Sequence, residues 1–519
     1  MSYTDFLPAA RPRLENLAAC EDWLARAALP DSPGGCGALA TLLVEIEADP
    51  PRHSAYLQIL ERLRHPAALA HTAHARRFAG KPLPLDHDES TALIHASTLW
   101  RAMLRAYQRL LGAALSGRHP ELKLSLELLF HRVIASCGEL IGCSWLARRG
   151  FGADHWQVLH QTYAAAEACG AARTPVPDLR ADSSPMSAYA EVLLLELAHP
   201  YGLSLREFGW ARAWVRSWSR QVTLGGAAPA RGAFAVDLAG KSGPARAGSD
   251  AAASTLRFLD LARVRRSVGE LVRGLEKGAA PEALGLGSDC PPLAAQELLK
   301  ILQRTWFESA PAREFPRRAG ASPLELVSGF AAIHHAIEGK PFAGGEKASG
   351  YSYGEAARLH TFRHAIEPGS PQETRAQGHE SWETLEESDR GFRLRRGTRG
   401  MRLAHRQLVA LRPAGAREFI LCHVDWLTEG PDQTLTIGAH ALHGVAKACA
   451  VRGADRSAPQ RSDALMLPVA PGLPAALVLP AGWYQRAREI ELKLGDAVRR
   501  VTLAGLLERG FDYERVRVS

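Results

Sequence analysis

The chain has 519 residues, of which 46% are hydrophobic and 23% are charged, and this composition is typical of a globular protein. Its length predicts two to four domains. The formal net charge of +8 is small for this length. Such a charge is compatible with phosphate-bearing ligands or acidic partners, but it gives no reason to expect binding to a nucleic-acid polymer.

No segment is predicted to cross a membrane. The apolar stretch around 192–197 is far shorter than the roughly 20 residues that a transmembrane helix needs. Residues 1–20 lack the charged start and apolar stretch of a secretory signal. None of the eight cysteines lies in a Cys-x-x-Cys pair, and most lie in apolar patterns, so we expect buried free thiols. We therefore expect a cytoplasmic protein.

The first 340 residues are predicted to be helical. The clearest helix is 90–114, whose apolar residues form one stripe and which follows the acidic, cap-rich segment 86–89. Further helices are expected at 122–146, 187–197, 205–222, 256–275, 292–306 and 323–337. No regular repeat of 34 residues is present, so we expect a helical array with irregular repeats. The pattern fits a solenoid and a compact bundle equally well.

Loose segments interrupt this helical pattern. Residues 225–249 are rich in Gly, Ala, Pro and Arg and are predicted to be a surface excursion or an insert. The Gly- and Ser-rich stretch 339–354 is the best domain boundary, and the polar stretch 369–378 is expected to be an exposed approach to the next domain. We therefore predict a helical domain over 1–340 and a linker over 341–380.

After residue 381 the pattern changes to strands. Strands are expected at 391–396, 407–412, 418–427, 433–442, 445–451, 464–469, 475–479, 488–494, 498–503 and 513–518. These are more strands than one small barrel requires. We predict a β-barrel over 381–452 and a second small β subdomain, or an extension of the barrel, over 453–519. The fold class is therefore multidomain, α followed by β.

The stretch 382–394, WETLEESDRGFRL, is predicted to be a strand, a polar turn over 386–391 and a second strand. Glu386 and Ser388 can hydrogen-bond a ligand or nearby backbone amides. Gly391 permits a positive φ or the close approach of another backbone. This turn is a candidate binding element.

The turn and the strands after it resemble the PilZ domain, a small β-barrel family that commonly binds cyclic di-GMP. The resemblance covers about a fifth of the chain: Glu386-x-Ser388-x-x-Gly391, then Val424-x-Trp426, then Ile437-Gly438. The family signature is an Arg-x-x-x-Arg pair followed by Asp/Asn-x-Ser-x-x-Gly, so Glu386 stands in place of Asp or Asn. The upstream arginines of this chain do not have the family spacing. The ligand-binding residues that we predict are Arg358, Arg363, Arg375, Glu386, Ser388, Gly391, Arg393 and Arg395.

Five arginines crowd the strand after the turn, namely Arg393, Arg395, Arg396, Arg399 and Arg402. On a strand, Arg393 and Arg395 point the same way. Neighbouring cations repel one another unless an anion or carboxylates neutralise them. Two interpretations remain open: a charged, solvated strand edge, or a site for the phosphates and guanine edges of cyclic di-GMP.

No catalytic motif is present, and paired histidines such as His71 and His74 lack a clear third ligand. We predict no catalytic site, no metal and no cofactor. Two functions remain open. In the first, the protein is a cytoplasmic cyclic di-GMP receptor that relays the signal through its helical region to an unidentified protein partner. In the second, it is a scaffold or assembly protein whose PilZ-like barrel no longer binds nucleotide.

Overall fold

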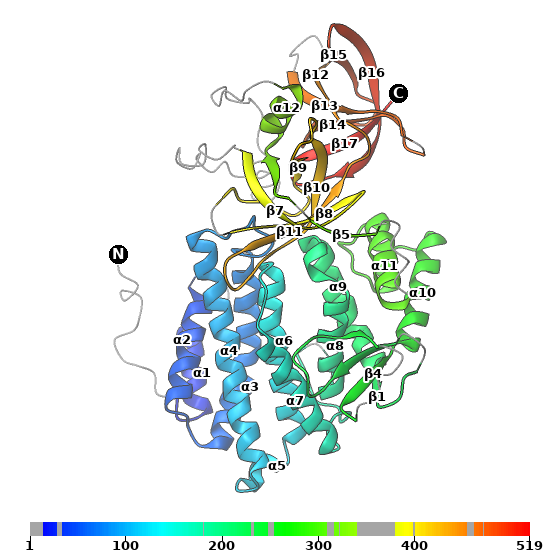
Figure 1. Cartoon of the computed structure of the whole chain (residues 1–519). Helices are drawn as coiled ribbons and strands as arrows, with labels where there is room; N and C mark the ends of the chain where they lie inside the picture. The colour runs from blue at the N-terminus through cyan, green and yellow to red at the C-terminus, as the bar shows by residue number, and fades with distance from the viewer. Residues whose placement is uncertain are drawn as a thin grey trace, which may run out of the picture. The chain divides into compact units, whose positions relative to one another are not determined.

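A computed structural model of the chain describes residues 14–27, 34–179, 181–229, 233–247, 254–308, 316–320, 322–339, 379–397, 400–453, 461–470 and 472–519. The chain divides into two compact units (Figure 1). The helical unit comprises residues 1–81 and 85–312, and the barrel unit comprises residues 82–84 and 313–519.

The helical unit is built from α-helices of very different lengths. Within the described residues they are α1 (Leu17–Arg26), α2 (Gly35–Ala48), α3 (His53–Ala75), α4 (His87–Leu115), α5 (Pro120–Lys123), α6 (Leu126–Leu146), α7 (Ala153–Ala168), α8 (Pro185–Leu197), α9 (Leu205–Trp218), α10 (Ala262–Glu276) and α11 (Pro292–Phe307). The predicted cap of α4 is confirmed. Asp86 Oδ1 accepts a hydrogen bond from the Glu89 amide at 2.9 Å, and Glu89 Oε2 accepts one from the Asp86 amide at 3.0 Å.

One hydrophobic core runs through the helical unit, from Leu14 to Trp306. Helices α4 and α6 pack against each other, α2 and α3 pack on α4, and α7 and α8 pack on α6. The apolar stripe of α4 supplies much of this core, because residues such as Trp100, Met103 and Tyr107 are all buried. The helices therefore form a bundle around one shared core, which decides between the solenoid and the bundle that the sequence left open.

The helical unit also contains a small sheet, which the sequence did not predict. Its strands are β1 (Thr223–Gly225), β2 (Phe234–Asp237), β3 (Ala245–Arg246) and β4 (Leu256–Asp260), in the order β1-β4-β2-β3. The predicted surface excursion thus supplies β2 and β3. The helix expected over 256–275 is divided into β4 and α10, because the apolar start of that segment pairs with β2 and not with a helical neighbour.

The first barrel of the barrel unit has six antiparallel strands in a closed ring. The ring runs β7 (His379–Ser388), β6 (Leu324–Ser328), β9 (Leu408–Pro413), β10 (Ile420–Glu429), β11 (Leu435–Ala441) and β8 (Gly391–Arg396). Pairing of β8 with β7 closes it, and the short β5 (Arg318–Ala319) pairs with the end of β7. The helix predicted over 323–337 was half wrong, because its first part is β6 and only Phe330–Glu338 forms α12.

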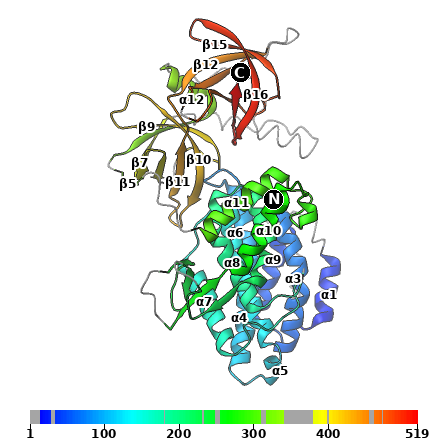
Figure 2. The same cartoon turned by 90° about the vertical axis from the view of Figure 1, so that its right-hand side faces the viewer.

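The second barrel is also closed and has six antiparallel strands (Figure 2). They are β12 (Lys447–Gly453), β13 (Arg461–Leu467), β14 (Ala476–Pro480), β15 (Glu489–Leu494), β16 (Ala497–Arg509) and β17 (Tyr513–Val518), in the order β12-β13-β14-β17-β16-β15. The segment after 453 is therefore part of a complete barrel and not an extension of the first. Strand β12 pairs with β13 and β15, so it belongs to the second barrel, although residues 447–452 were assigned to the first barrel in our prediction.

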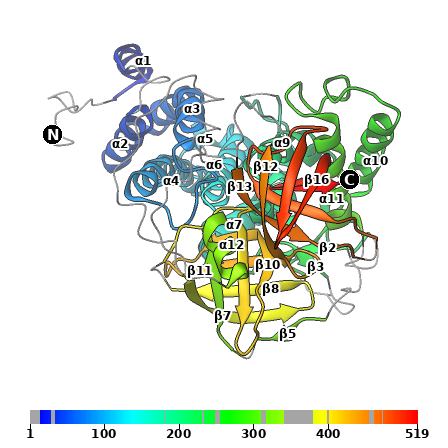
Figure 3. The ribbon, with the colours of Figure 1, turned by 90° about the horizontal axis from the view of Figure 1, so that it is seen from above.

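Helix α12 packs between strands of both barrels, against β6 and β9 of the first and β12 and β13 of the second (Figure 3). Its Ile333 belongs to a core cluster that also contains Leu408 of the first barrel and Leu465 of the second. The His334 ring donates a hydrogen bond from Nε2 to the Cys449 carbonyl oxygen of β12 at 3.0 Å. The two barrels are thus packed as one body through α12.

The predicted free thiols are confirmed, since all eight cysteines are unpaired and all but the exposed Cys169 are buried. Across the described part of the chain, no helix combines the length and the apolar character needed to span a bilayer.

Candidate ligand-binding site

The predicted binding turn is a tight hairpin between β7 and β8. Ser388 pairs with Gly391, so only Asp389 and Arg390 form the turn, and Glu386 and Ser388 lie within the strand β7. The Ser388 hydroxyl donates to the Gly391 carbonyl oxygen at 3.3 Å. The predicted turn over 386–391 was therefore too long, because strand pairing between β7 and β8 continues to Ser388 and Gly391.

Neither reason that we gave for Gly391 applies. Its φ is not in the left-handed region. A Cβ added there would meet Ser388 Oγ at 3.5 Å and the Ala439 carbonyl oxygen at 3.7 Å, which are ordinary van der Waals distances. The position tolerates a side chain, so the glycine is not required by the backbone geometry of this hairpin.

The acidic residues of β7 neutralise the arginines of β8. Glu386 accepts hydrogen bonds from Arg317 at 2.7 Å and from Arg393 at 3.2 Å. The bond from Arg317, reinforced by Arg393, holds the pKa of the Glu386 carboxyl below its usual range. Arg395 binds Glu383 with two hydrogen bonds of 2.9 and 3.1 Å. Carboxylates of β7 therefore neutralise these crowded arginines.

Arg396 differs from its two neighbours because it points inward. Its side chain is 5% exposed and forms an ion pair with Glu380. The guanidinium lies over the Trp382 ring, 4.9 Å from the ring centroid, and it donates to the Met401 carbonyl oxygen. Arg393 and Arg395 are exposed at 44% and 47%. Arg396 therefore stabilises the barrel from inside, whereas Arg393 and Arg395, on the other face of the strand, are accessible to a ligand.

The structure brings five of the eight predicted site residues together on this one hairpin: Glu386, Ser388, Gly391, Arg393 and Arg395. Arg358, Arg363 and Arg375 lie outside the described residues, as does Arg399. Sequence reasoning missed Arg317, which reaches Glu386 from the segment before β5. The pair Arg317-Arg318 is visible in the sequence, but nothing in its pattern shows that β5 pairs with β7.

The histidines give two groups of potential metal ligands in the described chain. One consists of His53, His119 and Glu121, and the other of His334, His335 and Glu338. The candidate pair His71 and His74 is buried in the helical core, and the His74 ring donates a hydrogen bond from Nε2 to the Ala92 carbonyl oxygen at 3.0 Å. That pair is part of the packing, and the absence of a metal stays a prediction.

Comparison with known protein families gives two matches. Residues 18–230 match the family described as cyclic-di-GMP receptor FimW, N-terminal domain. Residues 447–519 match the FimW C-terminal beta-barrel domain, and this match covers the second barrel from β12 to β17. No curated protein and no solved structure matches the chain. Neither match includes the first barrel, so the PilZ resemblance stays a prediction. The chain carries both the N-terminal domain and the C-terminal β-barrel domain of FimW, a family of cyclic di-GMP receptors.

Proposed function

We propose that this protein is a receptor for cyclic di-GMP. The observation that carries the proposal is the match of residues 18–230 to the N-terminal domain of a cyclic di-GMP receptor, followed in the right order by a match to the C-terminal barrel of the same family. The hairpin of β7 and β8 supports it independently, because it gathers exposed arginines beside a carboxylate and a hydroxyl.

The hairpin is the proposed contact with the nucleotide. Cyclic di-GMP carries two phosphates, which guanidinium groups bind with charge-assisted hydrogen bonds. It also carries two guanines, whose O6 and N7 atoms accept hydrogen bonds from arginine. Arg317, Arg393 and Arg395 offer such groups. Arg358, Arg363 and Arg375 belong to the proposed site on sequence grounds alone.

The carboxylates already bound to these arginines do not prevent binding. Exposed ion pairs contribute only about 0–1 kcal/mol each, so a phosphate can displace a carboxylate from Arg393 or Arg395 at small cost. When Arg393 is displaced, Glu386 Oε1 becomes free to accept a hydrogen bond from a donor group of a guanine, while Oε2 stays bound to Arg317. The proposed site is therefore a surface on which phosphates replace the carboxylates bound to the arginines, and not a preformed cavity.

The proposal includes a route for the signal. The protein acts in the cytoplasm without catalysis, and its helical unit passes the ligand-bound state on to a protein partner. The alternative is a scaffold protein whose first barrel has kept its fold and lost the nucleotide. The saturation of Glu380, Glu383 and Glu386 by arginines of the same hairpin favours that alternative, so ligand binding has to be measured directly.

The test is isothermal titration of cyclic di-GMP into the purified full chain, with GTP and cyclic di-AMP as controls. Arg393→Glu places a negative charge beside Glu386 and is expected to weaken binding at least about tenfold. Arg452→Glu is the matched control, because Arg452 is equally exposed at 44% and forms a comparable ion pair with Glu491 on the second barrel. A Ser388→Ala/Arg363→Ala double variant tests the rest of the site.

Binding that is lost in Arg393→Glu and kept in Arg452→Glu supports both the receptor and the hairpin. Binding that survives in every hairpin variant would move the site elsewhere in the chain. If the wild type releases no heat and shows no thermal shift at saturating ligand, the receptor proposal is wrong and the scaffold function takes its place. Partner capture with the full chain, with and without cyclic di-GMP, then tests the relay.

A further inference from the structure

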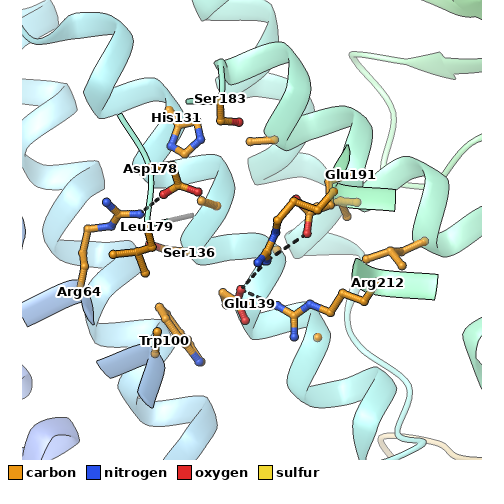
Figure 4. Close-up of a pocket in the computed structure, with 18 of the residues that line it drawn as sticks. Arg64, Trp100, His131, Ser136, Glu139, Asp178, Leu179, Ser183, Glu191 and Arg212 are labelled. Carbon is orange, nitrogen blue, oxygen red and sulfur yellow. Dashed lines mark hydrogen bonds and ion pairs between the residues drawn. The ribbon is translucent and has the colours of Figure 1, made fainter. Parts of the chain in front are cut away.

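The helical unit contains a partly open cavity of about 350 Å³, which is within the range of small-molecule sites. Its walls come from α3, α4, α6, α8 and α9 and from the segment after Pro177 (Figure 4). These elements are spread over more than 150 residues of the sequence, and no motif pointed to the cavity. It lies far along the chain from the hairpin and belongs to a different unit.

Small residues make room for this cavity. On α9, Gly209 and Ala213 line it, and a Cβ added at Gly209 would meet no atom within 4 Å. On α6, a Cβ at Gly142 would meet only the Arg212 guanidinium, at 3.9 Å. Gly209 is exposed, so it lies where the cavity meets solvent, and a larger side chain there would extend into this opening.

The wall is rich in charge. Its charged residues are Arg64, Arg132, Arg212, Arg216, Arg220, Glu139, Asp178 and Glu191. Arg132 is bound by Glu61 behind the wall, at 2.7 Å, which leaves four arginines facing three acidic groups. Arg220 forms no ion pair with any described residue. The cavity therefore has a net positive charge, and an anion suits it better than a cation or an apolar molecule.

Two buried polar atoms of the wall have no hydrogen-bond partner among the described residues. They are Nε1 of Trp100 and Nδ1 of His71, in side chains that are only 6% and 5% exposed as residues. Figure 4 shows the Trp100 indole at the wall between Arg64 and Glu139. An indole N–H can only donate, and an unsatisfied buried donor costs about 1–3 kcal/mol. A ligand with an acceptor atom would remove this cost.

Acidic and basic groups alternate on one side of the cavity. Glu139 forms ion pairs with Arg212 and, at 3.9 Å, with Arg216, and Arg216 also reaches Glu191 at 3.3 Å. Burial raises the pKa of the Glu191 carboxyl. A planar group that offers hydrogen-bond donors and acceptors side by side would match this wall. Guanine does so, because its N1 and N2 groups donate while O6 and N7 accept. Adenine lacks the adjacent N1–H and N2 donors that a carboxylate recognises.

We propose that this cavity binds a guanine nucleotide, with the base against Glu139, Glu191 and Trp100 and the phosphate held by Arg220. Where that nucleotide is cyclic di-GMP, the inference rests on the proposed function and adds a second, separate site within the helical unit. Where it is a mononucleotide such as GMP, the site stands without the hairpin. The probes below separate these two cases.

The experiment titrates GMP, AMP and cyclic di-GMP into the full chain. Gly209→Leu places a large side chain at the opening of the cavity. Leucine favours helix more than glycine by about 1 kcal/mol, so the variant should fold. Its matched control is Gly112→Leu, on α4. Gly112 is also an exposed helical glycine whose added Cβ meets nothing within 4 Å, but it does not line the cavity. Arg220→Ala, at an exposed position, is a second variant that leaves the core untouched.

We expect the wild type to bind GMP more tightly than AMP. Gly209→Leu should weaken binding at least about tenfold, and Arg220→Ala should weaken it several-fold. Gly112→Leu should leave binding unchanged. Equal binding of AMP, unchanged binding in Gly209→Leu, or no binding of GMP and cyclic di-GMP to the wild type would overturn the proposal. Cyclic di-GMP binding that is lost only in Arg393→Glu would overturn the cavity site and leave the receptor proposal intact. If the wild type binds GMP but not cyclic di-GMP, and Gly209→Leu loses the GMP binding, the cavity site is supported and the receptor proposal is overturned.

Discussion

Trp426 lies directly opposite Gly438 in the ladder of β10 and β11, and its indole covers the place where a side chain at residue 438 would stand. A Cβ added to Gly438 would lie 2.1 Å from Trp426 Nε1 and 2.5 Å from its Cε2. The tryptophan of the Val-x-Trp triplet and the glycine of the Ile-Gly pair thus form one cross-strand unit. Two separate parts of the PilZ-like pattern are explained by a single contact.

Gly438→Ala is expected to destabilise the barrel unit by about 1–3 kcal/mol, because the methyl group forces the indole off the sheet. The measurement is urea unfolding followed by tryptophan fluorescence. Gly391→Ala is the control, since its nearest neighbours would lie at ordinary contact distances of 3.5 and 3.7 Å, and it should change stability by less than about 0.5 kcal/mol. Equal effects at the two glycines would contradict this account.

Glu61 and Arg132 form a bidentate ion pair inside the helical unit, with hydrogen bonds of 2.8 and 2.7 Å, and Tyr107 donates to the same carboxylate at 2.8 Å. The Arg132 side chain is 2% exposed. Glu61→Ala leaves this buried cation without its main partner and should cost about 3–5 kcal/mol. Helical circular dichroism during denaturation measures the loss.

The matched control for this pair is Arg62→Ala. Arg62 lies on the same helix and forms an exposed ion pair with Glu21 at 3.4 Å, with side chains that are 45% and 56% exposed. Its removal should cost about 0–1 kcal/mol. A double variant in which Glu61 and Arg132 are both replaced by methionine should recover part of the loss, since it removes the unpaired charge.

Asp512 is expected to make the stability of the barrel unit depend on pH. Its Oδ1 accepts a hydrogen bond from the Leu408 amide at 2.9 Å, and burial raises the pKa of its carboxyl to about 7. Between about pH 4 and pH 7 the folded state therefore holds more protons than the unfolded state. The contribution of this group to stability must fall as the pH rises through that window and stay constant above it.

Asp512→Asn keeps the acceptor for Leu408 and removes the ionisation. The difference in stability between variant and wild type should increase from pH 5 to pH 8 in favour of the variant, with an upper limit of about 4 kcal/mol for the full shift. Thermal unfolding at several pH values measures it. A constant difference across this range would show that the carboxyl titrates at its ordinary pKa.

Arg395 and Arg396 are adjacent in β8 and should respond very differently to truncation. Arg395→Ala breaks an ion pair whose side chains are 47% and 56% exposed, so it should cost less than about 1 kcal/mol. Arg396→Ala removes a 5% exposed side chain, its ion pair with Glu380 and its contact with Trp382, and should cost about 3–5 kcal/mol. Denaturation of both variants checks the order, and a reversed order would contradict the inward placement of Arg396.

Much of the secondary structure could be read from the sequence, because helical stripes and strand alternation record which face of a local segment is buried. The helix predicted over 90–114 is α4 with its cap, and the strand predicted over 391–396 is β8. The errors fell where one apolar segment could serve either structure. Residues 324–328 form a strand only because β7 and β9 flank them.

The sequence by itself determined the order of a helical part and a strand-rich part, the capped helix α4, the free thiols and the cluster of charges on the hairpin. The tertiary structure decided that the strands close into two barrels, that β7 carboxylates neutralise the arginines, and that Trp426 covers Gly438. It alone created the cavity, whose wall brings Arg64 together with Arg220. The physical reason is the separation along the chain of the residues that interact. Periodicity and capping involve residues a few positions apart, whereas strand pairing, ion pairs between strands and the cavity depend on which distant segments pack together.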